Sequence, residues 1–229
     1  MSSAWMYTLI PAAAVVLGAV AAVNIRPGPR IVSAIQHLAA GVVFAAAAGE
    51  ILPDLMHRNA PVATVVGGGI ALAVMLAIKQ VEGLVKGPLG LLSMVGVDIL
   101  IDGLVLGIGF SAGAKAGILL TVALTLEVLF LGLTVANELG ESVRSRLAVV
   151  GATAALALLL PLGAVLATPV AALPPSIVAG FFAFGLIALL YLVTEELLVE
   201  AHQTPDRPWV TAMFFVGFLA ILVLEELMS

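Results

Sequence analysis

Three acidic residues stand inside apolar stretches of this sequence, where their side chains can bind a positive ion. Asp98 and Asp102 are four residues apart, so on a helix both carboxylates lie on one face, one turn apart. Glu127 lies near the middle of the next apolar stretch. Because only the short segment 113–116 separates the two stretches, we expect two antiparallel helices that bring the three acids to one depth.

Acidic side chains at the centre of a membrane need compensation. A single Asp there costs about 2.5–3.5 kcal/mol on insertion scales, so three acids together require protons or a cation. Carboxylate oxygens are hard ligands, and a set without Cys or a central His favours Mn, Fe(II), Mg or Ca over Zn, which also accepts carboxylates. Alternatively, each acid is protonated and hydrogen-bonds a backbone carbonyl or a hydroxyl such as that of Thr121 or Thr125. The convergence of three acids favours the cation site.

The segments that carry these acids are predicted to cross a membrane. The chain has 229 residues, of which 62% are hydrophobic and 10% charged, and its mean hydropathy is +1.24, whereas soluble domains are about 45–50% apolar. A spanning helix needs about 20 apolar residues. The sequence predicts eight of them, at 4–25, 33–56, 62–77, 89–110, 117–137, 147–168, 177–198 and 209–227. We therefore expect one all-α transmembrane domain over residues 1–229.

Charge and composition exclude several classes of function. The first eight residues have no Lys or Arg, so the first helix is expected to be a retained span and not a cleaved signal peptide. The chain has no cysteine, which removes disulfides and thiolate ligands. Its net charge of -5 is spread over helix ends, which predicts no surface that binds nucleic acid or lipid. Its abundance of Ala, Val and Gly points to a prokaryotic plasma (inner) membrane.

The basic residues divide unequally between the two sides of the membrane when the eight predicted helices alternate. Arg58 and Lys115 fall on one side. The other side holds Arg26, Arg30, Lys79, Lys86, Arg144, Arg146 and Arg207. The positive-inside rule then puts both termini outside, so that the second helix runs outward and the seventh inward.

The segment DILIDGLVLGIGF, residues 98–110, resembles the fourth-helix signature of the zinc/iron permease family, the Zrt/Irt-like or ZIP transporters. That signature reads His-Asn-x-x-acid-Gly, and Asp98, Ile99, Asp102 and Gly103 stand at its four defined positions. The segment EVLFLGL, residues 127–133, is similar to the second ligand motif of the family, with Glu127 at the first ligand position and Gly132 at the glycine.

The two motifs also depart from the family pattern. Ile99, Val128 and Leu131 replace the usual Asn and second acid, so one metal site is expected where many members have two. Three formal negative charges then face a dication, which predicts a shared proton and proton coupling. Gly103 and Gly107 form a small-xxx-small pair that predicts close approach of another helix beside the acids.

The resemblance implies a 3+2+3 arrangement in which helices 1–3 and 6–8 are inverted repeats. GEILPD, residues 49–54, aligns with EELLVE, residues 195–200, so that one acid pair lies toward the outer mouth and the other toward the inner mouth. The expected transport path comprises Glu50, Asp54, Glu195, Glu196 and Glu200. Solvated acids at helix ends are the alternative for Asp54 and Glu200.

Other polar residues in the helices are less informative. Pro53 is expected to kink the second helix and to release a backbone carbonyl. Solvated positions near helix ends are expected for His37, His57, His202, Glu225 and Glu226.

The resemblance implies a carrier of a divalent metal ion, Zn, Mn or Fe, by alternating access. The metal site would comprise Asp98, Asp102 and Glu127, the protein would not be an enzyme, and it would form a homodimer. Two alternatives stay open, a proton-coupled carrier of a non-metal cation and a non-transporting relative whose acids only hold helices together.

Overall fold

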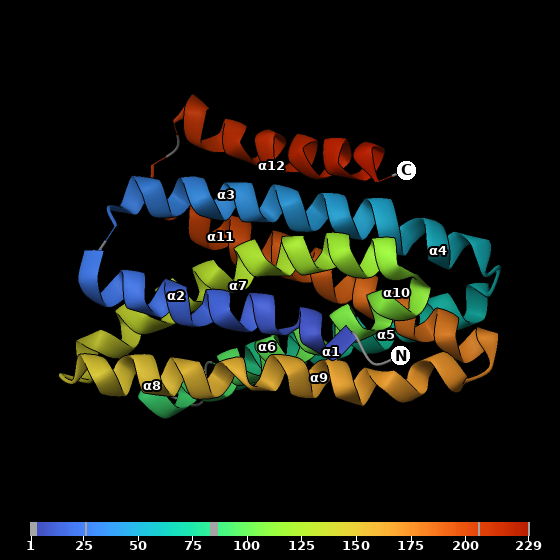
Figure 1. Cartoon of the computed structure of the whole chain (residues 1–229), viewed down its shortest axis with the longest axis horizontal. Helices are drawn as coiled ribbons and strands as arrows, with labels where there is room; N and C mark the ends of the chain where they lie inside the picture. The colour runs from blue at the N-terminus through green and yellow to red at the C-terminus, as the bar shows by residue number, and fades with distance from the viewer. Residues whose placement is uncertain (1–3, 26, 83–86, 206, 229) are drawn as a thin grey trace.

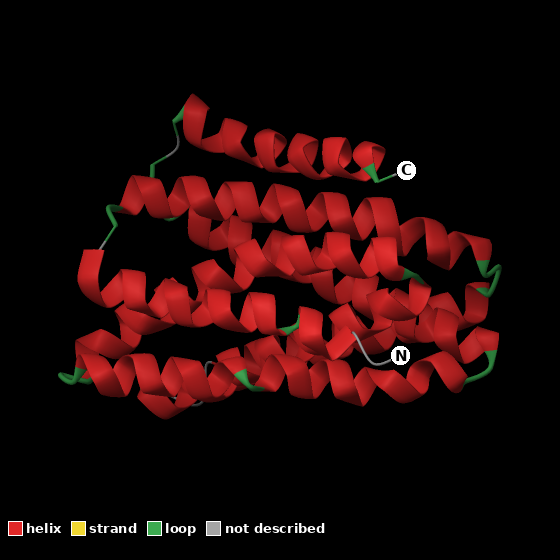
Figure 2. Cartoon of the chain, in the orientation of Figure 1, coloured by secondary structure: helices red, strands yellow, loops and turns green. Residues whose placement is uncertain are grey.

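The computed structural model describes residues 4–25, 27–82, 87–205 and 207–228, and this part of the chain is helical apart from short connections (Figures 1 and 2). Eight helical segments are long and apolar enough to cross a membrane, which confirms the predicted number and the all-α class. Arg26 and Lys86, two of the basic residues sorted above, lie outside the described residues.

The eight spans comprise the following elements. Span 1 is α1 (Ala4–Tyr7) and α2 (Leu9–Ile25); span 2 is α3 (Pro29–Ala46), η1 (Ala47–Ile51) and α4 (Leu52–His57); span 3 is α5 (Pro61–Glu82); span 4 is α6 (Pro88–Ala112); span 5 is α7 (Ala114–Ser142); span 6 is α8 (Arg146–Ala157), α9 (Leu159–Ala167) and η2 (Thr168–Ala172); span 7 is α10 (Pro175–Tyr191), η3 (Leu192–Leu197) and α11 (Leu198–Ala201); span 8 is α12 (Pro208–Leu227). Several spans begin at a proline, which is well tolerated there because the first helical N–H has no partner within the helix.

The spans pack in pairs around the two central helices. Span 1 lies along span 5 and span 6 along span 4, whereas span 2 lies along span 8 and span 7 along span 3. Figure 1 shows two of these pairs, α2 with α7 and α3 with α12. These four pairs are related by an internal symmetry. If spans 1, 2 and 3 are exchanged with spans 6, 7 and 8, and span 4 with span 5, each pair is replaced by another pair of the set.

Glycines allow the backbones of these pairs to touch. A Cβ atom added to Gly103 would lie 2.0 Å from the Leu160 carbonyl oxygen, and one on Gly163 would lie 2.1 Å from that of Leu100. A Cβ on Gly107 would lie 2.6 Å from the Ala167 Cβ. The close approach predicted from Gly103 and Gly107 is confirmed, and the helix that approaches is span 6.

Spans 2 and 7 each contain one π-helical segment, η1 and η3. In span 2, the Leu52 amide donates to the carbonyl of Ala47, five residues earlier. Pro53 follows directly and has no N–H to donate to the preceding turn. The kink that the sequence predicts at this proline therefore lies next to the π turn of η1. π turns inside α-helices often occur at functional sites, and here they overlap the acid-bearing segments 49–54 and 195–200.

Candidate functional site

The three central acids are buried between α6 and α7. Asp98, Asp102 and Glu127 are 5%, 2% and 2% exposed. The carboxyl groups of Asp102 and Glu127 lie within hydrogen-bonding reach of each other, and Asp98 interacts electrostatically with Glu127. The structure therefore brings together the acids that the sequence analysis selected, on facing helices inside the spans.

A small cavity connects this group to span 7. Its volume is about 30 Å³. It is lined by Asp98, Glu127, Phe130, Leu131, Thr134, Leu192, Glu196, Leu197 and Glu200. Four carboxylates from α6, α7, η3 and α11 thus share one cavity, and Glu196 also interacts with Asp102 beside it.

Several oxygens of the central acids lack a hydrogen-bond donor. Among the described residues, no donor reaches Asp102 Oδ2 or either carboxylate oxygen of Glu127, and all three atoms are buried. The hydroxyls of Thr121 and Thr125 do not fill this role, since they donate to the backbone carbonyls of Gly117 and Thr121, at 2.7 and 2.6 Å. Buried carboxylates in this arrangement are balanced only by shared protons or by a cation.

The described side chains do not form a closed metal site in this conformation. Among them, no group of three or more His, Cys, Asp or Glu is arranged to hold a metal ion. The acids meet in pairs, Asp102 with Glu127 and Glu196 with both, so a tighter ligand set would require a rotation of side chains or a shift of span 7 against α6 and α7.

At the Glu200 end of the cavity, span 2 is hydrogen-bonded to span 7. Gln36 Nε2 donates to Glu200 Oε2 at 2.7 Å, and Ser33 Oγ donates to the Ala201 carbonyl at 2.8 Å. Gln36 and Ser33 are both buried on α3. Glu200 therefore has a fixed neutral donor and is not a solvated helix-end acid.

One of the three histidines differs from expectation. His37 was expected to be solvated, but it is 2% exposed because it lies one turn after Ser33 on the face of α3 that packs against span 7. Its Nδ1 lies 2.9 Å from the Ser33 carbonyl oxygen, and its ring centroid is 5.1 Å from that of His202. His57 and His202 are exposed, as predicted.

Ion pairs occupy the opposite end of the molecule. Lys115 Nζ lies 3.9 Å from Glu50 Oε1 and 3.6 Å from Glu225 Oε1. Glu225 was expected to be solvated, yet it packs against span 2, where a Cβ on Gly49 would lie 2.7 Å from its Oε2. The absence of a side chain at Gly49 admits this carboxylate. Glu226 is exposed, as predicted.

Asp54, at the same end of the bundle, is also paired. Asp54 Oδ2 accepts from Arg58 at 3.0 Å, one helical turn away. The Arg58 guanidinium lies 4.3 Å from the centroid of the Phe182 ring. Neither Glu50 nor Asp54 lines the cavity that contains Glu127.

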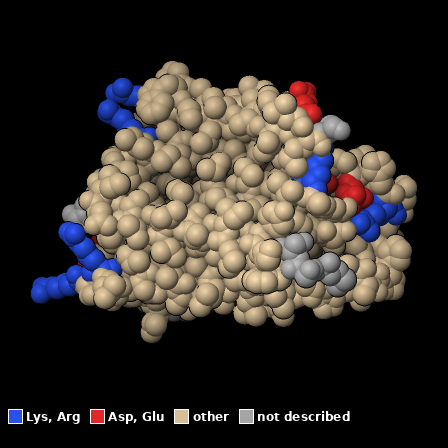
Figure 3. All heavy atoms as spheres, viewed as in Figure 1, with Lys and Arg blue, Asp and Glu red and all other residues tan. Residues whose placement is uncertain are grey.

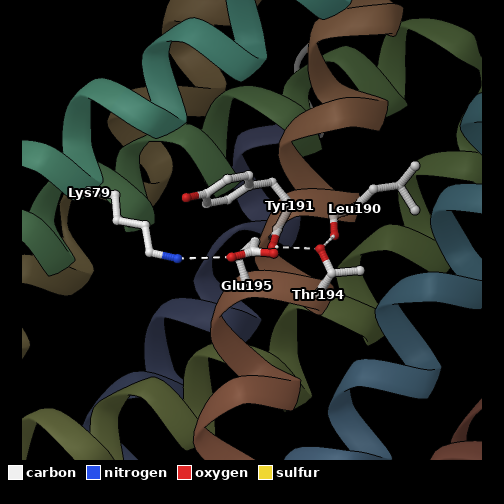
Figure 4. Close-up of polar contacts among 5 residues, drawn as sticks. All are labelled: Lys79, Leu190, Tyr191, Thr194 and Glu195. Atoms are coloured by element: carbon white, nitrogen blue, oxygen red, sulfur yellow. Dashed lines mark hydrogen bonds and ion pairs between the residues drawn. The ribbon is translucent and has the colours of Figure 1, made fainter.

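Glu195 lies away from the cavity. Figure 4 shows its carboxylate pointing to Lys79 on α5, and the two groups form an ion pair of 2.9 Å in which both side chains are about half exposed. The next residue in η3, Glu196, lines the cavity instead. Nearby, the Thr194 hydroxyl donates to the Leu190 carbonyl at 2.9 Å (Figure 4).

Three residues of this region were not selected from the sequence. Thr134 lines the cavity seven residues after Glu127, a spacing that puts both on one helix face and that was a usable signal. Gln36 and Lys115 carry no such signal, because their partners Glu200 and Glu225 lie more than 100 residues away in the chain.

No protein-family model matches this chain, and no curated protein sequence matches it. The likeness of segments 98–110 and 127–133 to ZIP motifs stays a prediction.

Proposed function

We propose that this protein is a ZIP-like transporter of a divalent metal cation, which moves the ion through the central acid site by alternating access. The observation that carries this proposal is the cavity inside the spans that is lined by the carboxylates of Asp98, Glu127, Glu196 and Glu200. Four carboxylates around one cavity attract a cation, and they come from the central helices and from span 7.

The size of the cavity favours a small ion. A volume of about 30 Å³ exceeds the roughly 10–15 Å³ that a cavity needs to hold one water molecule. A dehydrated metal ion or a proton-bearing water fits such a space, whereas an organic cation does not. This favours a metal ion over the alternative of a non-metal cation, and the oxygen ligands favour Mn or Fe(II) over Zn.

The described basic residues suggest how the protein sits in the membrane. Arg30, Lys79, Arg144, Arg146 and Arg207 lie in or beside the helix ends at one end of the bundle, and Arg58 and Lys115 lie at the other end. Figure 3 shows basic side chains projecting at the first end, and mixed basic and acidic side chains at the second. By the positive-inside rule the first end is cytoplasmic. We place both termini outside and the protein in a prokaryotic plasma membrane.

In this orientation we assign the structure to a state closed on the outside. Glu50 is bridged by Lys115 at the outer end, while the cavity reaches Glu196 and Glu200 toward the inner end. An ion would enter past Glu50, bind among Asp98, Asp102 and Glu127, and leave past Glu196 and Glu200. One proton held between Asp102 and Glu127 would be exchanged for the ion, since three carboxylates carry one charge more than a dication balances.

Metal flux in liposomes tests the proposal. The purified protein should transport Mn²⁺ or Fe²⁺, and the double variant Asp102→Asn plus Glu127→Gln should not, while its melting temperature stays the same or rises because two buried acids are neutralised. Zero flux of every metal with dissipation of a pH gradient would favour a proton carrier. Zero flux of both, with no metal-dependent change in melting temperature, would favour a non-transporting relative.

A further inference from the structure

A second pocket lies away from the acid site, where α7 ends and α8 begins. Its volume is about 390 Å³. It is lined by Ala22, Val23, Ala136, Asn137, Gly140, Glu141, Val143, Arg144, Arg146 and Val149. The pocket therefore combines apolar side chains of α2, α7 and α8 with an amide, one carboxylate and two guanidinium groups.

The two arginines of this pocket form no ion pair with any residue that the structure describes. Arg58, Lys79 and Lys115 each lie within 4 Å of a carboxylate, whereas neither Arg144 nor Arg146 has such a partner among the described residues. Both arginines are exposed. Their N–H donors thus stay available, and a guanidinium presents these donors in the planar fork that matches two oxygens of a phosphate.

The position of the pocket defines what kind of phosphate reaches it. The pocket lies where span 5 ends at Ser142 and span 6 begins at Arg146, which is the depth of the headgroups in a bilayer. Basic pockets between transmembrane helices on the cytoplasmic side suit anionic lipid headgroups. Ala22, Val23 and Val149 provide an apolar wall for the part of a lipid that continues into the membrane.

We propose that this pocket binds the phosphodiester headgroup of an anionic phospholipid from the leaflet on the basic side of the protein. Two arginines and Glu141 together carry one net positive charge, which balances the single negative charge of a phosphodiester. The Asn137 amide and the Glu141 carboxylate can donate to and accept from a hydroxyl of the headgroup. The net charge of the whole chain does not reveal this local excess, because most carboxylates lie elsewhere.

Thermal unfolding of the purified full-length protein in detergent tests the site. Adding phosphatidylglycerol should raise the melting temperature by about 3–6 °C at a tenfold excess over the dissociation constant, and phosphatidylcholine should not. The double variant Arg144→Gln plus Arg146→Gln should lose this rise. Arg30→Gln is the matched control, since Arg30 is exposed at the same end but does not line the pocket, and it should keep the rise.

Native mass spectrometry provides a second measurement, because it counts bound lipids directly. Retained phosphatidylglycerol in the wild type, and its loss in the double variant alone, would support the site. The proposal is overturned by an equal rise with phosphatidylcholine, by an unchanged rise in the double variant, or by inorganic phosphate reproducing the whole effect without lipid. None of these readouts depends on metal transport.

Discussion

Lys115, at the start of α7, forms an ion pair with Glu50 of η1, and 3.9 Å separates the ammonium nitrogen from the carboxylate oxygen. The same ammonium lies 3.6 Å from Glu225 on α12. One lysine on the helix that carries Glu127 thus holds spans 2 and 8 together at the proposed outer end. It occupies the place where an arriving dication would meet Glu50.

Removing this lysine should accelerate transport. An ion pair with partly exposed partners contributes about 0.2–1 kcal/mol, so Lys115→Gln should raise metal uptake at limiting metal concentration by about 1.5- to 5-fold. Initial rates in liposomes measure this effect. Lys79→Gln is the control, because it removes an ion pair with Glu195 that lies away from the cavity, and its rate should stay at the wild-type value. A slower Lys115→Gln variant would contradict the assignment of Lys115 as a closure.

Neighbouring glutamates in span 7 should differ sharply. Glu196 lines the cavity and interacts with Asp102 and Glu127, whereas Glu195 pairs with Lys79 at the surface. Glu196→Gln should lower metal flux by about 10- to 150-fold, since a contact with a charged group contributes about 1.5–3 kcal/mol. Glu195→Gln should leave the flux nearly unchanged. Equal losses in both variants would mean that span 7 is oriented differently during transport.

Metal binding should release protons. If the ion displaces a proton held between Asp102 and Glu127, the apparent affinity rises with pH, by about tenfold per pH unit for each proton displaced. Titration calorimetry in two buffers with different ionisation enthalpies counts the protons released. Glu127→Gln should reduce that number. A binding heat that is independent of the buffer would rule out this coupling.

Close packing of the central helices should depend on Gly103. A Cβ at this position would lie 2.0 Å from the Leu160 carbonyl oxygen, so the backbones must separate to admit it. Overpacking costs about 1–3 kcal/mol, and Gly103→Ala should therefore lower the melting temperature by about 2–12 °C. Gly151→Ala serves as the control, because nothing lies within 4 Å of a Cβ at that helical position. Its melting temperature should stay constant or rise slightly, since alanine favours helix.

The sequence by itself determined the number of spans, their approximate limits and the acids of the central helices. Long apolar stretches predict membrane-spanning helices directly, because the thickness of the bilayer determines how long a spanning helix must be. The spacing of Asp98 and Asp102 and of Gly103 and Gly107 reports a shared helix face. These are properties of single helices, and the structure bears them out for Asp98, Asp102 and Gly103.

Only the tertiary structure decided which of the remaining charges face one another. Glu195 and Glu196 are indistinguishable by type and differ only in the rotation of span 7, and a π turn in η3 changes that rotation because it adds a residue to the turn. The partners of Gln36 and Lys115, and the pocket that Arg144 and Arg146 share, depend on which helices pack side by side. Helical periodicity determines the direction in which a side chain points from the axis of its own helix. Which residue it then contacts depends on which spans pack together, and glycines far apart in the sequence allow that packing.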